Sequence, residues 1–528
     1  MTTSADPPWS TPDRSAAGPS AAGSSAVGSS AAGSSGVGAD DRVALRRRAL
    51  LGGGALVAAA TALAACSSVA RTPTRPAAPS RATSPLPDIQ FDVARYSAPE
   101  QTSPTGGPFT MPPVHTVYLT ATLGRTPGPA DQRELTRVLD ELESRYAFGA
   151  AGLMTFVSYG LPYFRRLPGP VVDAHLPRLA ADPARSVLEE AVPGPTDVHP
   201  DQPGVTKRRF TVPVRIEAND LLFTFRSDRA TTIQDVLAWF GGSGRLAGQA
   251  VPSPAFAGLL TVTSTRHMFT QVGLPRSVAE QNQLPYARFI QPDSPMWMGF
   301  SDQQTNASGP PAICTFAGTD AARLTTARPG DYLDNGSIQH LSHVILDMLQ
   351  FYDMATATTP PSENGSFAKR VQYMFHAPAV HPGNADQLTD GGGPSFLPAE
   401  NRGPDYAERT ARGIGLPAGE RRMGHLSTLQ RTSRAADGTP MHLRIDGPGF
   451  DALDVPDGSN QPKLHFSVFV PTADFFATMR RSQASVDLAR RHRVAEQDNG
   501  LERFLTCTRR QNFLVPPRRH RAFPLLGV

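Results

Sequence analysis

A histidine at the end of an apolar run is the first candidate for chemistry in this chain. The stretch VQYMFHAPAVHPGNAD, residues 371–386, places His376 directly after Tyr373, Met374 and Phe375. A neutral imidazole nitrogen in such a setting can bind an iron ion if an acceptor holds the other ring nitrogen. The same setting suits a histidine that is simply packed and hydrogen bonded in a core. Spacing alone favours the core histidine, so a ligand role needs support from other residues.

Two further stretches place a charged side chain between apolar segments. MWMGFSDQQTNASGP (296–310) carries Asp302 in a turn rich in small and polar residues, and MHLRIDGPGF (441–450) carries Arg444 on a short apolar strand before a Gly-Pro turn. A carboxylate can transfer protons, and a guanidinium can stabilise developing negative charge. Both residues also have structural interpretations, Asp302 as a turn or helix cap and Arg444 as a surface ion-pair partner.

Length, charge and cysteine content limit the function classes. The chain has 528 residues, a length that indicates more than one domain. Its net charge of +4 gives no strong electrostatic preference for a partner. No Lys/Arg-rich face interleaved with aromatics occurs in the sequence, so we expect no nucleic-acid partner. The cysteines Cys66, Cys314 and Cys507 lack metal-site spacing. The two later ones either pair in an oxidising compartment or stay as buried thiols.

The first 65 residues have the layout of an export signal. Residues 1–41 are Ser, Ala, Gly, Pro and Asp with little to bury, so we expect disorder there. Three arginines, 46–48, then precede the uncharged stretch 49–65, as in a secretory signal, and they resemble a twin-arginine signal. Leu63-Ala64-Ala65-Cys66 resembles a bacterial lipobox, in which the cysteine is lipidated. The alternative is an ordinary signal with Cys66 incidental. Either way, we expect an exported protein, anchored on the outer face of the membrane or extracellular.

Strand and helix patterns begin after a spacer. Residues 66–113 are rich in Pro, Ser, Thr and Ala and are predicted to be a linker. The stretch 339–352 suits either an apolar helix or a strand. Strand–helix–strand followed by strand–helix indicates an α+β unit with helices on one face of an antiparallel sheet. The predicted strands are 114–124, 151–160, 219–228, 258–273 and 463–471, and the predicted helices are 131–147, 230–242 and 472–492.

Taken in order along the chain, the three stretches resemble the dye-decolourising peroxidase family, over roughly residues 114–520. The matching segments are Gly299-Phe300-Ser301-Asp302 for the family's G-x-x-D-G turn, His376-x4-His381-Pro382 for H-x4-N-P, Leu443-Arg444 before Gly447-Pro448 for L-R-x-x-x-P, Leu464 and Phe466 for the L-L-F strand, and NFLVPP (512–517) for the F-F-x-x-P-P close.

The resemblance implies a fold and a domain division. The fold class is α+β, with two ferredoxin-like domains of antiparallel sheet, of the dimeric alpha-beta barrel-like superfamily. The N-terminal domain would span 114–290, and the C-terminal, haem-binding domain would span 291–528 with a long insertion at 382–440.

The resemblance also implies a cofactor and residue roles. The cofactor would be haem b, with His376 as the iron ligand and Leu464 and Phe466 lining its distal face. Asp302 would act as acid–base catalyst, and Arg444 would stabilise charge on the leaving oxygen of the peroxide. The small-molecule partners would be peroxide and an organic electron donor, and a lipid anchor would supply the membrane contact. The resemblance leaves open whether the chain forms a homo-oligomer.

The sequence departs from the family pattern at named positions. Gln303 replaces the last glycine of the aspartate turn, and His381 and Gly383 replace an expected Asn and Arg. The Gln303 departure and the long insertion at 382–440 favour a second interpretation, a non-catalytic haem-binding or haem-handling surface lipoprotein. A third is a surface lipoprotein without haem, in which His376 belongs to the core. If His376 is not the iron ligand, His381 and His343 are the next candidates.

Overall fold

The computed structural model describes most of the predicted folded part of the chain. The described residues are 86–92, 101–102, 108–109, 112–189, 209–290, 294–298, 314–318, 324–352, 354, 442–472 and 502–528. Among these, no helix combines the length and the apolar character that a membrane span requires.

The first half of the body has a β-α-β-β-α-β order. Its four strands pair antiparallel in the spatial order β4-β6-β3-β9, which is the ferredoxin-like arrangement. The predicted strands and helices of this half are all present, with bounds that differ from the predicted ones by a few residues. The elements are β3 His115–Leu123, α3 Pro129–Arg145, β4 Met154–Gly160, β6 Leu221–Ser227, α6 Ala230–Phe240 and β9 Leu260–Phe269.

The second half repeats this strand order. Its described strands lie in the order β12-β13-β10-β14, antiparallel throughout, with β11 also paired to β13. The ambiguous stretch 339–352 is a strand followed by a short helix. Residues 447–448, expected to form a turn, lie instead in a strand. The elements are β10 Ser337–Leu346, α9 Met348–Phe351, β11 Leu443–Arg444, β12 Gly447–Asp451, β13 Gln461–Val470 and β14 Leu505–Val515.

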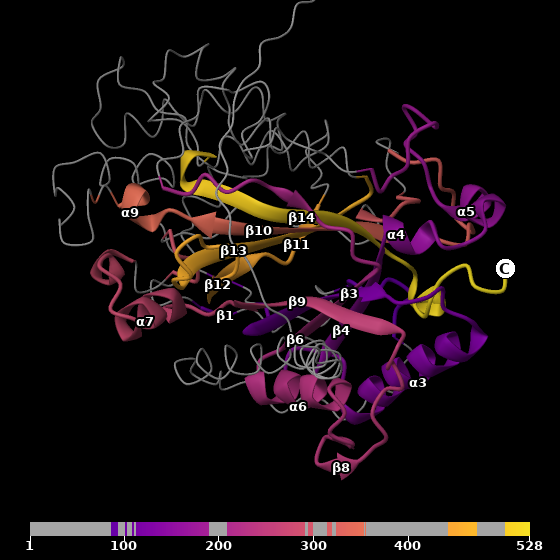
Figure 1. Cartoon of the computed structure of the whole chain (residues 1–528), viewed down its shortest axis with the longest axis horizontal. Helices are drawn as coiled ribbons and strands as arrows, with labels where there is room; N and C mark the ends of the chain where they lie inside the picture. The colour runs from indigo at the N-terminus through magenta and orange to yellow at the C-terminus, as the bar shows by residue number, and fades with distance from the viewer. Residues whose placement is uncertain are drawn as a thin grey trace, which may run out of the picture. The chain divides into compact units, whose positions relative to one another are not determined.

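The described strands of the two halves form one 10-stranded sheet (Figure 1). Strand β14 joins β4 through the pairs Phe513–Gly160 and Leu514–Tyr159. At the other end of the sheet, β12 lies against β9, where a Cβ on Gly447 would come within 2.9 Å of the sulfur of Met268. The strands of the two halves therefore enclose an interior between them. The expected fold class, α+β with antiparallel sheet in ferredoxin-like units, is confirmed.

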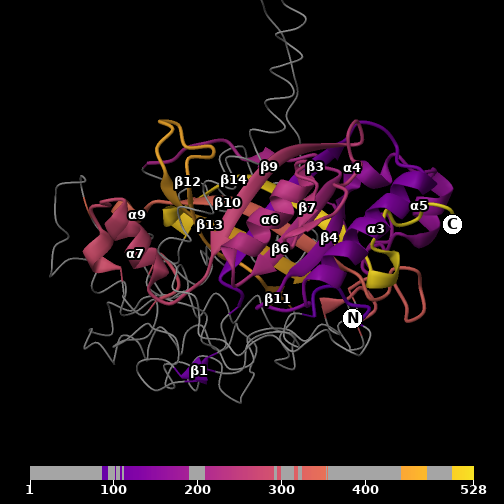
Figure 2. The same cartoon turned by 90° about the horizontal axis from the view of Figure 1, so that it is seen from below.

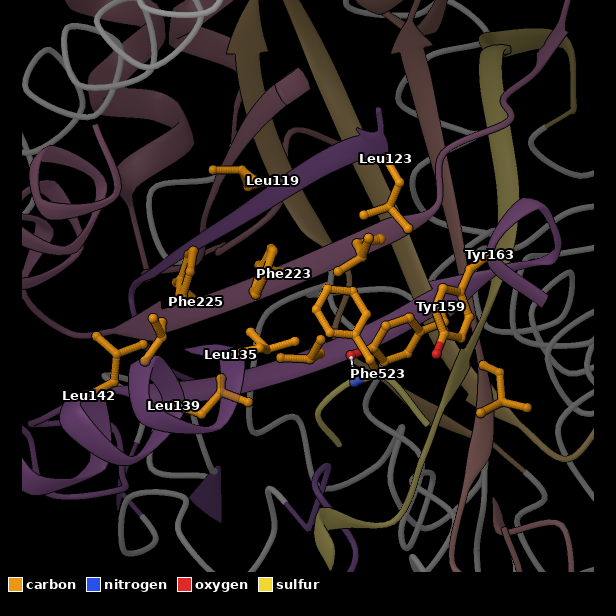
Figure 3. Packing of buried hydrophobic residues seen from close by; sticks show 14 of the residues in the cluster. Leu119, Leu123, Leu135, Leu139, Leu142, Tyr159, Tyr163, Phe223, Phe225 and Phe523 are labelled. Carbon is orange, nitrogen blue, oxygen red and sulfur yellow. Dashed lines mark hydrogen bonds between the residues drawn. The ribbon is translucent and has the colours of Figure 1, made fainter. Parts of the chain in front are cut away.

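The main apolar core lies between the first half of the sheet and its two long helices (Figure 2). Helix α3 begins with Pro129, and the Asp131 carboxylate accepts the backbone N–H of Gly128 at 2.7 Å, which caps the first turn. Leu135, Leu139 and Leu142 pack towards Phe223 and Phe225 of β6 (Figure 3). This helix buries the residues that its sequence period predicted: Leu135, Val138, Leu139 and Leu142.

The end of the chain closes this core. The Tyr159 hydroxyl donates to the carbonyl of Arg521 at 2.7 Å and accepts the backbone N–H of Phe523 at 2.7 Å, and the second bond is drawn in Figure 3. The Tyr163 hydroxyl donates to the carbonyl of Pro524 at 2.6 Å. The C-terminal segment is thus held by two tyrosines of the first half.

Part of the predicted linker belongs to the body. Phe91 is fully buried, and its ring stacks on Phe469 of β13 with centroids 4.6 Å apart. The Gln90 side chain donates to the carbonyls of Val157 at 3.2 Å and Pro516 at 2.8 Å. Composition suggested a spacer for all of 66–113, but residues 86–92 pack into the fold, because one aromatic side chain and one amide find partners there.

Short elements complete the described part. A two-residue strand, β5, adds to β14 in parallel, while β1 pairs with β2 and β7 with β8 in separate two-stranded sheets. Their bounds, with those of the minor helices, are β1 Gln101–Thr102, β2 Pro108–Phe109, α4 Leu161–Phe164, α5 Gly169–His175, β5 Arg215–Ile216, β7 Arg245–Leu246, β8 Gln249–Ala250, α7 Leu274–Gln281, and the 3-10 turns Ala287–Phe289, Glu502–Phe504 and Arg518–His520.

Candidate functional site

Three of the predicted site residues lie on one face of the second half of the sheet. Arg444 stands opposite Val468 in the pairing of β11 with β13, and Leu464 and Phe466 alternate with Val468 along β13. Directly paired residues of antiparallel strands share a face, as do residues two apart along a strand. Arg444, Leu464 and Phe466 therefore point to the same side, which we call the outer face, away from the interior between the halves.

A histidine that the sequence did not single out also lies on the outer face. His340 of β10 pairs with Val468 and with Asn512 of β14. Its Nδ1 lies 2.7 Å from the Asn512 amide oxygen and its Nε2 lies 2.6 Å from the Ser342 hydroxyl. Its ring centroid is 6.2 Å from that of Phe466. Because both ring nitrogens are hydrogen bonded, the ring of His340 is held in place and has no nitrogen available to bind iron.

The outer face carries guanidinium groups. The Arg444 side chain is 18% exposed and its Nε lies 3.9 Å from the Asp446 carboxylate, a distance at the limit of an ion pair. Arg510 of β14 pairs with Ser342 on the same face and is buried, with its Nε donating to the sulfur of Cys507 at 3.3 Å. A buried cation beside apolar side chains can stabilise negative charge on a bound molecule.

The remaining predicted site residues lie outside the described part of the chain. These are Asp302, the predicted acid–base group, His376, the predicted iron ligand, and Cys66, the predicted lipidation site. The two later cysteines are described, and both are buried thiols that are not joined by a disulfide. Burial raises the pKa of Cys314 above its usual range, which keeps this thiol protonated and unreactive.

His343, a reserve candidate for the iron ligand, lies on the opposite face from Arg444. It pairs directly with His465 of β13, and both side chains point into the interior between the halves. The centroids of the two rings are 5.3 Å apart. Since neighbours along a strand alternate in direction, His343 cannot share a ligand with the three predicted residues of the outer face.

The interior holds a polar cluster that sequence reasoning missed. Asp451 at the end of β12 places one carboxylate oxygen 3.5 Å from His343 Nε2 and the other 3.7 Å from His465 Nε2. Lys463 on β13 is also buried, and its Nζ lies 3.6 Å from Asp451 and donates to the carbonyl of Leu453 at 2.8 Å. The alternation Lys463, His465, Ser467 in β13 was the available signal, since it puts polar groups on one face of a strand.

Burial dominates the protonation of this cluster. It lowers the pKa of His465 well below the ordinary histidine value, and that of His343 as well, against the opposing attraction of Asp451. Burial lowers the pKa of Lys463 to about 8. Burial alone would raise the pKa of the Asp451 carboxyl, but the adjacent His343, His465 and Lys463 outweigh it and hold that pKa low. At neutral pH the imidazoles are therefore uncharged beside a carboxylate.

The described residues of the outer face fit part of what a haem needs. Leu464 and Phe466 offer half-buried apolar contacts, and Arg444 offers a cation beside them. His340 has both ring nitrogens hydrogen bonded, so it does not offer a nitrogen to an iron ion. The interior cluster is polar and enclosed by strands, and it does not suit a porphyrin.

Comparisons with known proteins found solved structures that resemble the chain. They also found one protein family whose model matches it. The encapsulated DyP-type peroxidase from Mycobacterium smegmatis is 13% identical, with a TM-score of 0.37, over 79% of this chain and 96% of that chain. DyPB from Rhodococcus jostii RHA1 is 15% identical, with a TM-score of 0.41, over 79% of this chain and 96% of that chain. No curated protein matches the chain.

The family match covers nearly all of the folded body. It begins just before β3 and ends just after β14, so it takes in both halves of the sheet. Because the model of a family of unknown function, DUF7405, matches residues 113–517, the chain belongs to that family.

Proposed function

We propose that the chain is a haem-dependent peroxidase, which reduces hydrogen peroxide and oxidises an organic donor. The observation that supports this best is the placement of Arg444, Leu464 and Phe466 on one face of the sheet. The sequence resemblance selected these residues from two separate segments, and strand register brings them to the same side.

The residues have distinct roles in this proposal. Bound haem b would supply the iron at which peroxide is reduced. His376 would hold that iron from one side, while Leu464 and Phe466 pack against the other side and exclude water. The Arg444 guanidinium would stabilise negative charge on the departing oxygen, and the Asp302 carboxylate would carry a proton from one peroxide oxygen to the other.

The site of action follows from the first 66 residues. We propose that the arginine-containing signal exports the chain and that a lipid on Cys66 anchors it to the outer face of the membrane. The support is the order of charged, apolar and small residues before Cys66. Export through a twin-arginine route would deliver the protein already folded.

A visible spectrum of the purified full chain tests the haem assignment. Adding haem should produce a Soret band, which His376→Ala should remove or shift to that of weakly held haem. His381→Ala is the matched control from the same segment and should leave the band unchanged. If the wild type shows no Soret band, the haem proposal fails. If His376→Ala keeps the wild-type spectrum, the ligand is a different residue.

Turnover separates a peroxidase from a haem-handling protein. With haem bound, the full chain should oxidise a dye in the presence of peroxide faster than free haem does. A protein that binds haem but adds nothing to the rate of free haem would support the haem-handling alternative, which the Gln303 departure keeps open.

A further inference from the structure

A second cluster of ligand-type side chains lies in the interior between the two halves of the sheet, on the other face from Arg444. His343 and His465 are directly opposite each other on β10 and β13, and Asp451 comes from the neighbouring strand β12. One ligand atom from each of the three residues can be chosen so that all three atoms lie within 4.8 Å of one another. Both histidines are fully buried, and 26% of the Asp451 side chain is exposed.

Hydrogen bonding fixes the proton on His343. The Thr508 hydroxyl donates to the Asp454 carboxylate at 2.9 Å, so its oxygen is left to accept from His343 Nδ1 at 2.8 Å. The proton of a neutral His343 is therefore on Nδ1, and Nε2 carries a lone pair. That lone pair faces the Asp451 carboxylate oxygen at 3.5 Å. His343 Nε2 is buried, so two electron-rich atoms at this separation call for a cation between them.

His465 supports the same conclusion independently. Within the described part of the chain, neither of its ring nitrogens has a hydrogen-bond partner, and both are buried. Its Nε2 points towards the second carboxylate oxygen of Asp451 at 3.7 Å. Gly449 makes room for this ring, because a Cβ there would come within 2.4 Å of Nε2. A buried imidazole with two unsatisfied nitrogens is costly unless something occupies one of them.

Among the described cations around the cluster, one would compete with a metal ion for the Asp451 carboxylate. Arg509 is held by Asp454 at 2.6 Å and by Glu217 at 3.3 Å, and Glu217 also pairs with Arg266. These guanidinium groups are thus neutralised by their own partners. Lys463, 3.6 Å from Asp451, is the described cation that faces the carboxylate.

We propose that His343, His465 and Asp451 bind a divalent first-row transition-metal ion. Two imidazoles and one carboxylate are a common donor set for Zn²⁺ and non-haem Fe²⁺, with positions left open for water. Ligand atoms about 2.1 Å from a tetrahedral metal lie roughly 3.4 Å apart, so the three ligand atoms, which lie within 4.8 Å of one another here, would draw closer around the ion. The bond from His343 Nδ1 to Thr508 is the kind of support that orients a metal-binding histidine.

This metal site is separate from the proposed haem site. The two sets of residues alternate along β13, where His465 points inward and Leu464 and Phe466 point outward. The partly exposed Asp451 gives an ion a route from solvent to the two histidines. The inference therefore stands whether or not haem binds to the chain.

Cobalt(II) added to the haem-free, chelator-treated full chain tests the proposal. One equivalent should give visible d–d absorption bands. His465→Ala and Asp451→Asn should each weaken cobalt binding by at least about 10–100-fold, since even losing a supporting partner costs that much. His520→Asn, a partly exposed histidine near the C-terminus, is the matched control and should bind cobalt like the wild type. Lys463→Met should tighten binding, because it removes the cation that competes for Asp451.

The outcomes decide the assignment. Absence of d–d bands in the wild type, or equal cobalt affinity in His465→Ala and His520→Asn, overturns it. X-ray absorption of the zinc-loaded wild type gives an answer that depends on no variant. A first coordination sphere with two imidazoles supports the site, and one without imidazole overturns it. Haem plays no part in either measurement, so failure here is distinct from failure of the peroxidase proposal.

Discussion

Phe91 and Phe469 stack nearly parallel, with ring planes inclined by 9° and centroids 4.6 Å apart. One ring comes from a segment that composition assigns to a linker, and the other comes from a central strand of the second half of the sheet. The contact ties the chain before the first strand to the interior of the body, so the stable unit begins earlier than residue 112.

Phe91→Ala should destabilise the protein by about 3–5 kcal/mol, because it removes a fully buried aromatic side chain from a packed site. Phe91→Leu is the control and should cost less, since it keeps most of the buried apolar volume. Urea denaturation of the two variants and the wild type measures the difference. If Phe91→Ala and the wild type unfold at the same urea concentration, the segment 86–92 is not part of the stable body.

Tyr159→Phe should loosen the C-terminal segment. The change removes the donor to the Arg521 carbonyl and leaves the Phe523 N–H without its acceptor, at a cost of about 1–3 kcal/mol. Hydrogen exchange of residues 521–525 should accelerate, while exchange in α3 stays slow. Tyr332→Phe is the comparison, because its hydroxyl accepts a single bond from the N–H of Leu525 at 3.1 Å and should matter less. Equal exchange in both variants would contradict the proposed clamp.

His115 should make stability depend on pH in the acid range. Burial lowers its folded-state pKa from 6.5 to about 4, so the unfolded chain binds a proton at a pH where the folded protein does not. The free energy of unfolding is therefore full above about pH 6.5 and falls as the pH drops towards 4, by up to about 3 kcal/mol for this group.

Urea denaturation at pH 7, 6, 5 and 4.5 checks this expectation against a His115→Gln variant. The variant lacks the titrating ring, so it should lose less stability over this range than the wild type. Its partner His267, 3.1 Å away, remains in both proteins and serves as a common background. Parallel stability curves for the two proteins would show that His115 does not carry the effect.

Arg444→Leu should slow the first peroxide-dependent spectral change of the haem-loaded protein by a factor of about 100–1,000, because a charged donor to the leaving oxygen is lost. Asp302→Asn keeps the side-chain shape but removes the proton acceptor. The rate of the same step should fall by up to about 100–10,000-fold. We expect the larger loss at Arg444, because Gln303 alters the turn that carries Asp302.

Stopped-flow mixing with peroxide measures both rates. Arg125→Leu is the control, since Arg125 is an exposed arginine paired with Asp131 at the start of α3. If the Arg444 and Asp302 variants react at the wild-type rate while still holding haem, the peroxidase proposal fails and the haem-handling alternative takes its place.

The local elements of this protein could be predicted from its sequence alone. Helix α3 buries the four residues that its 3.6-residue period marked, and strands β3, β4, β6 and β13 fall within a few residues of their predicted bounds. The spacing of apolar residues, 3.6 residues per turn in a helix and 2.0 in a strand, carries this information. Both spacings can be found within a single segment. The motif resemblance also picked Arg444, Leu464 and Phe466, which proved to share a face.

Which strands are neighbours, and in which register they pair, could not be predicted from the sequence. A one-residue slip of β10 against β13 would separate His343 from His465 and reverse every side chain between the two faces. Asp451 joins them because β12 pairs with β13, in a region that the sequence suggested was a turn. Phe91 reaches the core for a similar reason, since its partner lies on a distant strand. Contacts between distant segments depend on how whole sheets pack, which no local period encodes.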